Sequence, residues 1–281
     1  MSKPLLDNAA LQANTVSVSF AGVAAVAGVD LQVDSAEVHA LVGPNGSGKT
    51  TLLNAISGFA RTQHGSLHTF GHDITRAAPN RRAALGIGRT FQSPMVIADV
   101  KVLDLLEIGL YLRDSRSFWA SAFRPIWTER KSREFRRQAA DALQQSGLEP
   151  ELVDEDVSAL SHGQLKMVDV ARALLGQPRV LLLDEPAAGL DESETAILHD
   201  LILSLKATGV SVLVVEHNVQ FVLNLVDRVT VLDQGKILAV GDPRATLARP
   251  EVVAAYLGPR AVHRAEPGED KAAESARRSS P

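Results

Sequence analysis

The sequence lacks cysteine altogether, and this absence excludes disulfide bonds and metal sites built from thiolates. It also lacks a continuous apolar stretch of about 20 residues, the length that a membrane-spanning helix needs. Residues 1–11 do not combine a basic start with an apolar run, so no secretory signal peptide is expected. We therefore expect a soluble, cytoplasmic protein that associates with a membrane only through a partner.

Neither sign of charge dominates the chain. Its 29 basic and 33 acidic side chains give a net charge of −4, which points neither to nucleic acid nor to an anionic membrane. A basic cluster at residues 130–137 is preceded by Glu129 and interrupted by Glu134, a pattern typical of a solvated helix face. No nucleic-acid partner is expected.

Short apolar runs predict the strands of an α/β fold. Residues 180–183 and 212–215 are continuously aliphatic, and residues 38–42 are aliphatic apart from His39, which favours a central parallel sheet covered on both faces. Residues 15–20 and 29–33 instead alternate apolar with polar side chains, which favours strands of a half-exposed sheet. Helical patterns lie between the runs, as expected for this fold class.

The middle of the chain differs in character from its ends. Residues 100–145 contain no strand-like runs, and one helical face is formed by Val102, Leu105, Leu106 and Gly109. Residues 129–145 have the pattern of a charged amphipathic helix that ends before Gly147. We expect a helical subdomain, about residues 93–165, inserted in the α/β core.

Toward the C-terminus the chain carries one more strand pair and then loses its large apolar residues. Residues 229–232 and 237–240 flank Asp233-Gln234-Gly235-Lys236, which predicts a hairpin. Residues 259–281 are rich in Ala, Arg, Glu, Ser and Pro, a composition typical of a disordered tail.

A phosphate-binding motif follows the apolar run at residues 38–42. The segment Gly43-Pro44-Asn45-Gly46-Ser47-Gly48-Lys49-Thr50 matches the pattern G-x-x-x-x-G-K-[ST], and a helix is expected over residues 51–56. Its glycines let the backbone wrap around a phosphate, and the helix adds the positive end of its dipole. Lys49 should reach the β- and γ-phosphates, and the Thr50 hydroxyl should bind Mg²⁺. The expected nucleotide contacts are Gly43, Asn45, Gly46, Ser47, Gly48, Lys49, Thr50 and Thr51.

Two acidic residues, Asp184 and Glu185, end the apolar run at residues 180–183. The carboxyl end of a parallel strand lies beside the phosphate loop in sheets of this kind. Asp184 should hold Mg²⁺ through water, and Glu185 should act as the general base that polarises the attacking water. Two acids could also merely open a loop, but the phosphate motif favours the catalytic interpretation. Together the two motifs indicate a P-loop NTPase.

The segment Leu160-Ser161-His162-Gly163-Gln164 identifies a family that the sequence resembles. It is similar to the signature L-S-G-G-Q of the ATP-binding-cassette ATPases and precedes the acidic strand, as in that family. Ser161 and Gln164 have the spacing of a capping box, a common feature of helix starts in its own right. The resemblance implies that Ser161, Gly163 and Gln164 bind the γ-phosphate of a nucleotide held by a second subunit. His162 departs from the usual glycine, at a position that varies in the family.

The resemblance assigns roles to further residues in serial order along the chain. Gln92 matches the catalytic-site glutamine that senses Mg²⁺ and links to the membrane subunit, and His217 matches the histidine that contacts the γ-phosphate. Ala188-Gly189-Leu190-Asp191 matches the loop that crosses the dimer interface. Phe20 lies where the family places an aromatic ring for adenine stacking, with Val26 nearby. Each of these residues alone is more often structural, so the assignment depends on their order.

The resemblance covers about residues 11–258 and implies one ATP-binding-cassette domain. The implied fold is an α/β P-loop NTPase core of the RecA-like type with a mostly parallel sheet, an N-terminal antiparallel β subdomain and an inserted α-helical subdomain. Two such domains would form a head-to-tail dimer that encloses ATP and Mg²⁺ between them. The implied partners are a second ATPase subunit, identical or different, transmembrane permease subunits and, indirectly, a solute-binding protein. The chain would then be peripheral on the inner face of the cell membrane.

A finer resemblance concerns the transported molecule. Residues 184–190, 215–218 and 255–258 are similar to the ATPase subunits of branched-chain amino acid importers. That group includes subunits serving urea and short amides, which residues 160–164 fit as well. We expect an ATPase that powers import of branched-chain or other amino acids, with a urea or short-amide importer as the alternative. An export ATPase, a cytosolic cassette acting on DNA or ribosomes, a P-loop kinase and a non-hydrolysing regulatory module are less favoured.

Overall fold

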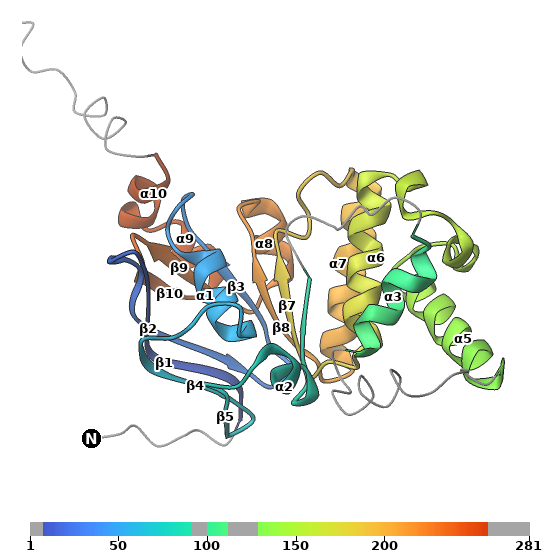
Figure 1. The fold of residues 1–281 in the computed structure, drawn as a ribbon. Coiled ribbons are helices and arrows are strands. Elements are labelled where there is room, and N and C mark those ends of the chain that lie inside the picture. Colours follow the sequence, from blue (N-terminus) through green and yellow to red (C-terminus); the bar gives the residue numbers. More distant parts are fainter. Residues whose placement is uncertain (1–7, 91–99, 112–128, 258–281) are drawn as a thin grey trace, which may run out of the picture.

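The central sheet has six strands, seen in a computed structural model that describes residues 8–90, 100–111 and 129–257 (Figure 1). The strand order is β10-β9-β3-β8-β7-β6. The strands are β3 (Val38–Val42), β6 (Ile87–Arg89), β7 (Val180–Asp184), β8 (Ser211–Val215), β9 (Arg228–Asp233) and β10 (Lys236–Gly241). Every neighbouring pair is parallel except β9 and β10, which form the predicted hairpin. The predicted central sheet is confirmed.

The strands β3, β7 and β8 are buried along their whole length. Alternate side chains enter two different cores, because Leu182 and Leu213 belong to the first while Leu181 and Val212 belong to the second. Coverage of both faces explains why these runs are apolar rather than alternating. His39 of β3 is the exception, and its ring is hydrogen-bonded to Glu37 and Thr230.

A smaller antiparallel sheet has the order β2-β1-β4-β5. Its strands are β1 (Ala9–Phe20), β2 (Val23–Asp34), β4 (His64–Thr69) and β5 (His72–Asp73). In β1, residues 10–13 are all buried, and Thr15 has a φ of 47° where the register with β2 shifts. Such an irregularity moves side chains to the other face of a sheet. The alternating pattern therefore predicted only residues 15–20 of a longer strand.

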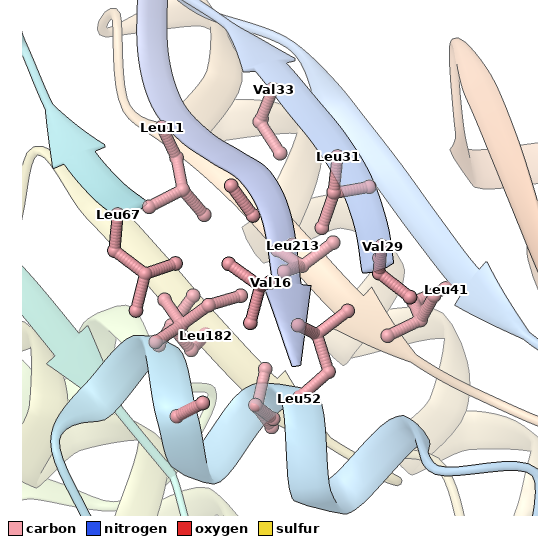
Figure 2. Close-up of a cluster of buried hydrophobic side chains, with 14 of the residues drawn as sticks. Leu11, Val16, Val29, Leu31, Val33, Leu41, Leu52, Leu67, Leu182 and Leu213 are labelled. Carbon is pink, nitrogen blue, oxygen red and sulfur yellow. The ribbon is translucent and has the colours of Figure 1, made fainter. Parts of the chain in front are cut away.

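Helix α1 (Lys49–Ser57) packs between the two sheets and completes the first core. Figure 2 shows Leu52 of α1 close to Val16 of β1 and to Leu182 and Leu213 of the central sheet. The helix begins within the phosphate motif rather than at residue 51, and Gly58 ends it in the left-handed conformation.

The opposite face of the central sheet is covered by helices from the C-terminal half. These are α7 (Glu192–Ala207), α8 (Val219–Leu225), α9 (Pro243–Leu247) and α10 (Pro250–Leu257). Leu198, Phe221 and Val252 contribute their side chains to the second core. The short helix α2 (Pro79–Ala84) leads into β6 at the edge of the sheet.

A third core lies among α3 (Val102–Tyr111), α5 (Glu129–Gln145) and α6 (His162–Leu175), with 3-10 turns at Pro150–Asp154 and Val157–Ala159. The predicted helix over residues 129–145 is confirmed. Helix α6 belongs to two cores, since Leu165 and Val168 face the third while Met167 and Val170 face the second. The helical layer is thus joined to the central sheet through α6.

Parts of the predicted domain division lie outside the described residues, namely 93–99 and 112–128 of the helical subdomain and the tail at 259–281. Within the described ranges, no helix is both long and apolar enough to cross a membrane.

Candidate functional site

A pocket lies at the carboxyl ends of β3, β7 and β8. Its volume is about 670 Å³, within the range of small-molecule sites. It is lined by Ala25, Gly43, Pro44, Asn45, Gly46, Gly48, Lys49, Thr50, Thr51, Glu185, His217 and Tyr256. Parallel strands bring their carboxyl ends to one edge, so residues distant in the sequence meet here. The structure therefore gathers most of the predicted phosphate contacts with Glu185 and His217.

The backbone of the phosphate loop is closely packed against its neighbours. Gly43 has a φ of 148°, and a Cβ atom there would lie 2.0 Å from the carbonyl oxygen of Leu232. Gly48 has a φ of 104°, and its Cβ would lie 2.3 Å from the carbonyl oxygen of Ala25. Only glycine fits at both positions. Gly48 is also the N-cap of α1 and has no side chain to bond the first N–H groups of the helix, which suits an anionic ligand.

The Lys49 side chain folds back toward the start of the phosphate loop. Its Nζ donates to the carbonyl oxygens of Gly43 at 2.8 Å and Pro44 at 2.9 Å. Burial lowers the pKa of Lys49, whereas the charges of Glu185 and Asp184 act in the opposite direction. The ammonium group is thus already inside the loop, where phosphate oxygens can replace the carbonyl acceptors.

Asp184 is buried at the end of β7 and fits the predicted Mg²⁺ site. Arg89 Nη2 is 3.3 Å from its Oδ2, while its Oδ1 has no hydrogen-bond partner among the described residues. A buried carboxylate oxygen of this kind suits Mg²⁺, which prefers oxygen ligands and retains water. Burial raises the pKa of Asp184, and the Arg89 guanidinium opposes that rise. Thr50, the other predicted Mg²⁺ ligand of the described residues, lines the pocket, whereas Asp184 lines a small separate cavity beside Glu185.

Glu185 and His217 follow neighbouring strands and both line the pocket. Nδ1 of His217 is 4.0 Å from Oε1 of Glu185. Glu185 has a φ of 48°, in the left-handed region that is strained for a residue with a Cβ. A carboxylate beside an imidazole can accept a proton from water while the ring contacts a phosphate oxygen.

The signature segment lies away from this pocket. Ser161 Oγ accepts from the Gln164 N–H at 3.1 Å, and Gln164 Oε1 accepts from the Ser161 N–H at 2.9 Å, which confirms the predicted capping box. A Cβ on Gly163 would lie 2.1 Å from Oε1 of Glu194, so the Glu194 carboxylate lies against the first turn of α6. None of residues 160–164 is among the described residues that line the pocket. A nucleotide on the loop would not touch the signature of the same chain.

The remaining predicted contacts are placed less directly. Phe20 is 55% exposed and lies outside the pocket lining, which leaves its ring accessible to a base. Val26 has no exposed surface, and its Cγ2 would lie 3.4 Å from a Cβ on Gly48, so it supports the loop from the core. Ser47 is buried in the loop rather than lining the pocket. Gln92 lies outside the described residues.

Tyr256 lines the pocket, although the sequence did not assign it to the site. Its hydroxyl contacts the backbone of Gly43, and burial raises the pKa of Tyr256. An aromatic residue in the last described helix carries no local signal of this contact. Only the packing of α10 near the loop brings it there.

The model of the ABC transporter family matches residues 26–188. The branched-chain amino acid transport ATP-binding protein BraF of Pseudomonas aeruginosa is 34% identical over 92% of this chain and 99% of its own length. The probable branched-chain amino acid transport ATP-binding protein LivG of Archaeoglobus fulgidus is 36% identical over 88% of this chain and 95% of its own.

Solved structures give the same result. A nucleotide-free ATP-binding cassette from an ABC transporter matches with a TM-score of 0.76 and 32% identity, covering 89% of this chain and 99% of that one. An ADP conformation of such a cassette matches with the same score, identity and coverage. The phosphate loop, the acidic strand and the separate signature helix are therefore found in a chain that belongs to the ABC transporter family, as an ATP-binding cassette with a P-loop NTPase fold.

Proposed function

We propose that this chain hydrolyses ATP in the pocket and thereby powers import of branched-chain or other amino acids through partner permease subunits. The observation that carries the proposal is the meeting of Lys49, Asp184, Glu185 and His217 at one edge of the central sheet. The resemblance to branched-chain amino acid transport ATP-binding proteins over nearly the whole chain supports the class of cargo.

The residues of the pocket have different roles in hydrolysis. The loop N–H groups and Lys49 bind the β- and γ-phosphates and stabilise the charge that develops on them. Glu185 accepts a proton from the attacking water, and His217 contacts the γ-phosphate beside it. Thr50, Asp184 and Gln92 would hold Mg²⁺, whose chemistry there would be to offset the negative charge of the phosphates.

A second cassette completes the site. Ser161, Gly163 and Gln164 lie at the N-terminus of α6, remote from the pocket of their own chain. A head-to-tail partner would bring these N–H groups and the Ser161 hydroxyl to the γ-phosphate, where an anion is favoured by the helix dipole. The partner is either a second copy or a different ATPase subunit. Loss of the γ-phosphate removes the shared ligand and loosens the dimer.

The permease subunits would place the chain on the inner face of the cell membrane, and a solute-binding protein would take part indirectly. A urea or short-amide importer is the second candidate, because the signature segment at residues 160–164 fits the subunits of that group as well. ATP hydrolysis would be the same in both cases, since the cassette does not contact the cargo.

The test measures uptake and partners in the native cells. Cells lacking the chain are complemented with the wild-type protein or with Glu185→Gln, and uptake of labelled leucine, valine and urea is compared. Restoration of leucine and valine uptake by the wild type alone supports the proposal, and recovery of permease subunits with tagged Glu185→Gln in ATP supports the assembly. Restoration of urea uptake alone selects the second candidate. Recovery of only ribosomal or DNA-bound partners would overturn the transport function.

A further inference from the structure

We infer that Lys166 and Glu216 are positioning residues, which hold the backbone of Glu185 and His217 and so connect the signature helix α6 to the hydrolytic centre. Neither residue touches the nucleotide pocket. The inference rests on the ATP hydrolysis proposed above, and it concerns how the catalytic pair is kept in place.

Lys166 supports the strained residue of the site. It is 8% exposed, and its Nζ donates to the carbonyl oxygen of Glu185 at 2.8 Å. On the other side, the Glu185 N–H donates to the carbonyl oxygen of Val215 at 2.9 Å. A non-glycine residue at positive φ persists only where its surroundings determine the conformation. These two bonds fix the peptide groups on both sides of the catalytic carboxylate.

Glu216 joins the two catalytic loops. It has no exposed surface, and its Oε1 accepts from the Ala187 N–H at 2.9 Å. Its Oε2 accepts from the N–H groups of His217 at 3.1 Å and Asn218 at 3.4 Å. Ala187 follows Glu185 on the loop after β7, whereas His217 follows β8. One buried carboxylate therefore sets the separation of the two loops that carry the base and the histidine.

The charges of the two positioning residues are complementary. Burial lowers the pKa of Lys166, and Glu216 is the leading charge that opposes this change, ahead of Glu185 and Asp184. A cavity of only about 10 Å³ remains beside Lys166, Asp184 and Glu185, at the lower limit for a single water molecule. The group is thus closely packed, and a displacement of Lys166 is passed to the Glu185 backbone.

Helix α6 carries both Lys166 and the proposed γ-phosphate contacts of the signature segment. Lys166 lies on the helix that Ser161 caps and that packs into two cores. A partner's ATP that binds at Ser161 would therefore act on the same rigid element that holds the Glu185 carbonyl. If Lys166 contributed to folding alone, its substitution would change stability but would not lower turnover by the folded protein.

The experiment compares Mg-ATP hydrolysis by the full-length wild type with that by Lys166→Met and Glu216→Gln. Lys206→Met is the matched control, because Lys206 forms an ion pair with Asp227 away from the pocket. We expect kcat to fall about 10- to 100-fold in both variants, as for a small misplacement of a catalytic group. ATP affinity should change less than about threefold, and Lys166→Arg, which keeps a donor, should recover part of kcat.

The same substitution made in the Glu185→Gln variant distinguishes positioning of Glu185 from a general structural effect. In Glu185→Gln, the added change Lys166→Met should lower the residual single-turnover rate little further, because the lysine acts through Glu185. A full additional fall would overturn the inference, as would wild-type kcat in folded Lys166→Met and Glu216→Gln. If Lys166→Met does not fold, Glu216→Gln and Lys166→Arg decide. A wild-type chain without ATPase activity would instead contradict the proposed function itself.

Discussion

Lys49 and Glu185 lie in the same pocket but have separable tasks. The Lys49 ammonium lies inside the phosphate loop, whereas Glu185 is placed beside His217 at the ends of β7 and β8. Binding should therefore depend on the first residue and turnover on the second. The sequence predicted both roles from motifs, because each motif combines a residue type with the strand or helix that presents it.

Lys49→Ala should lower ATP affinity about 10- to 100-fold. The expected size follows from the loss of charge-assisted hydrogen bonds to phosphate, each contributing about 1.5 to 3 kcal/mol. Isothermal titration with ATP measures this loss, with Lys206→Ala as the control for removal of a lysine. Unchanged affinity in Lys49→Ala would contradict the assigned role.

Glu185→Gln should bind ATP as the wild type does but hydrolyse it about 10²- to 10⁴-fold more slowly, because an amide cannot accept the proton of water. Equilibrium binding and a phosphate-release assay on the same preparation separate the two effects. An equal loss of ATP affinity in Glu185→Gln and Lys49→Ala would show that the division of tasks is wrong.

Helix α6 packs its body into two cores, and its first turn is the part that we propose contacts a partner subunit. The capping box is made by Ser161 and Gln164, and α6 contacts both the helical layer and the central sheet. Its start was predicted from the spacing of Ser161 and Gln164 and is confirmed, whereas its packing into two cores is seen only in the structure. The contact between Gly163 and the Glu194 carboxylate of α7 could not be predicted from the sequence, since the two residues lie far apart along the chain.

Ser161→Arg should block ATP-driven dimerisation while the monomer still binds ATP. The added side chain fills the position proposed for the γ-phosphate of the partner site, and loss of the cap costs only about 1 kcal/mol. Light scattering with Glu185→Gln as the background gives the oligomeric state. Ser204→Arg, at an exposed position of α7, is the control for added bulk and charge. An ATP-dependent dimer of Ser161→Arg would count against the composite site.

The two sheets of the molecule are joined by a buried acid. Glu37 bonds His39 of β3, the Asp34 N–H at the end of β2 and Arg228 of β9. Burial alone would raise the pKa of Glu37, but the His39 and Asp34 hydrogen bonds, with the charges of His39 and Arg228, leave it below the ordinary value of 4.5. The carboxylate form is therefore stabilised by folding.

Stability should consequently depend on pH through Glu37. Because its folded pKa is lowered, its contribution is present above pH 4.5 and is lost as the pH falls through the folded pKa. Glu37→Gln should lower the free energy of unfolding at pH 7 by about 1 to 3 kcal/mol and should weaken the acid dependence. Thermal unfolding from pH 7 to pH 3 tests this, with the exposed Glu151→Gln as control. Parallel curves for Glu37→Gln and the wild type would contradict it.

At the scale of the whole chain, the sequence by itself determined the class of fold and the chemistry of the phosphate site. Continuous apolar runs specify a sheet buried on both faces, and the phosphate motif needs only its own glycines, its lysine and the helix that follows. These signals are local, so residues 38–50 and 180–185 carry them without reference to the rest of the molecule.

Only the tertiary structure decided which distant residues meet. The sequence could not show that Tyr256 reaches the loop, that Val26 lies wholly in the core, or that Lys166 and Glu216 hold the catalytic backbone. The full length of β1 was also missed, because a bulge at Thr15 interrupts its alternation. These features depend on side chains that approach across elements, and no spacing along a single element encodes such an approach.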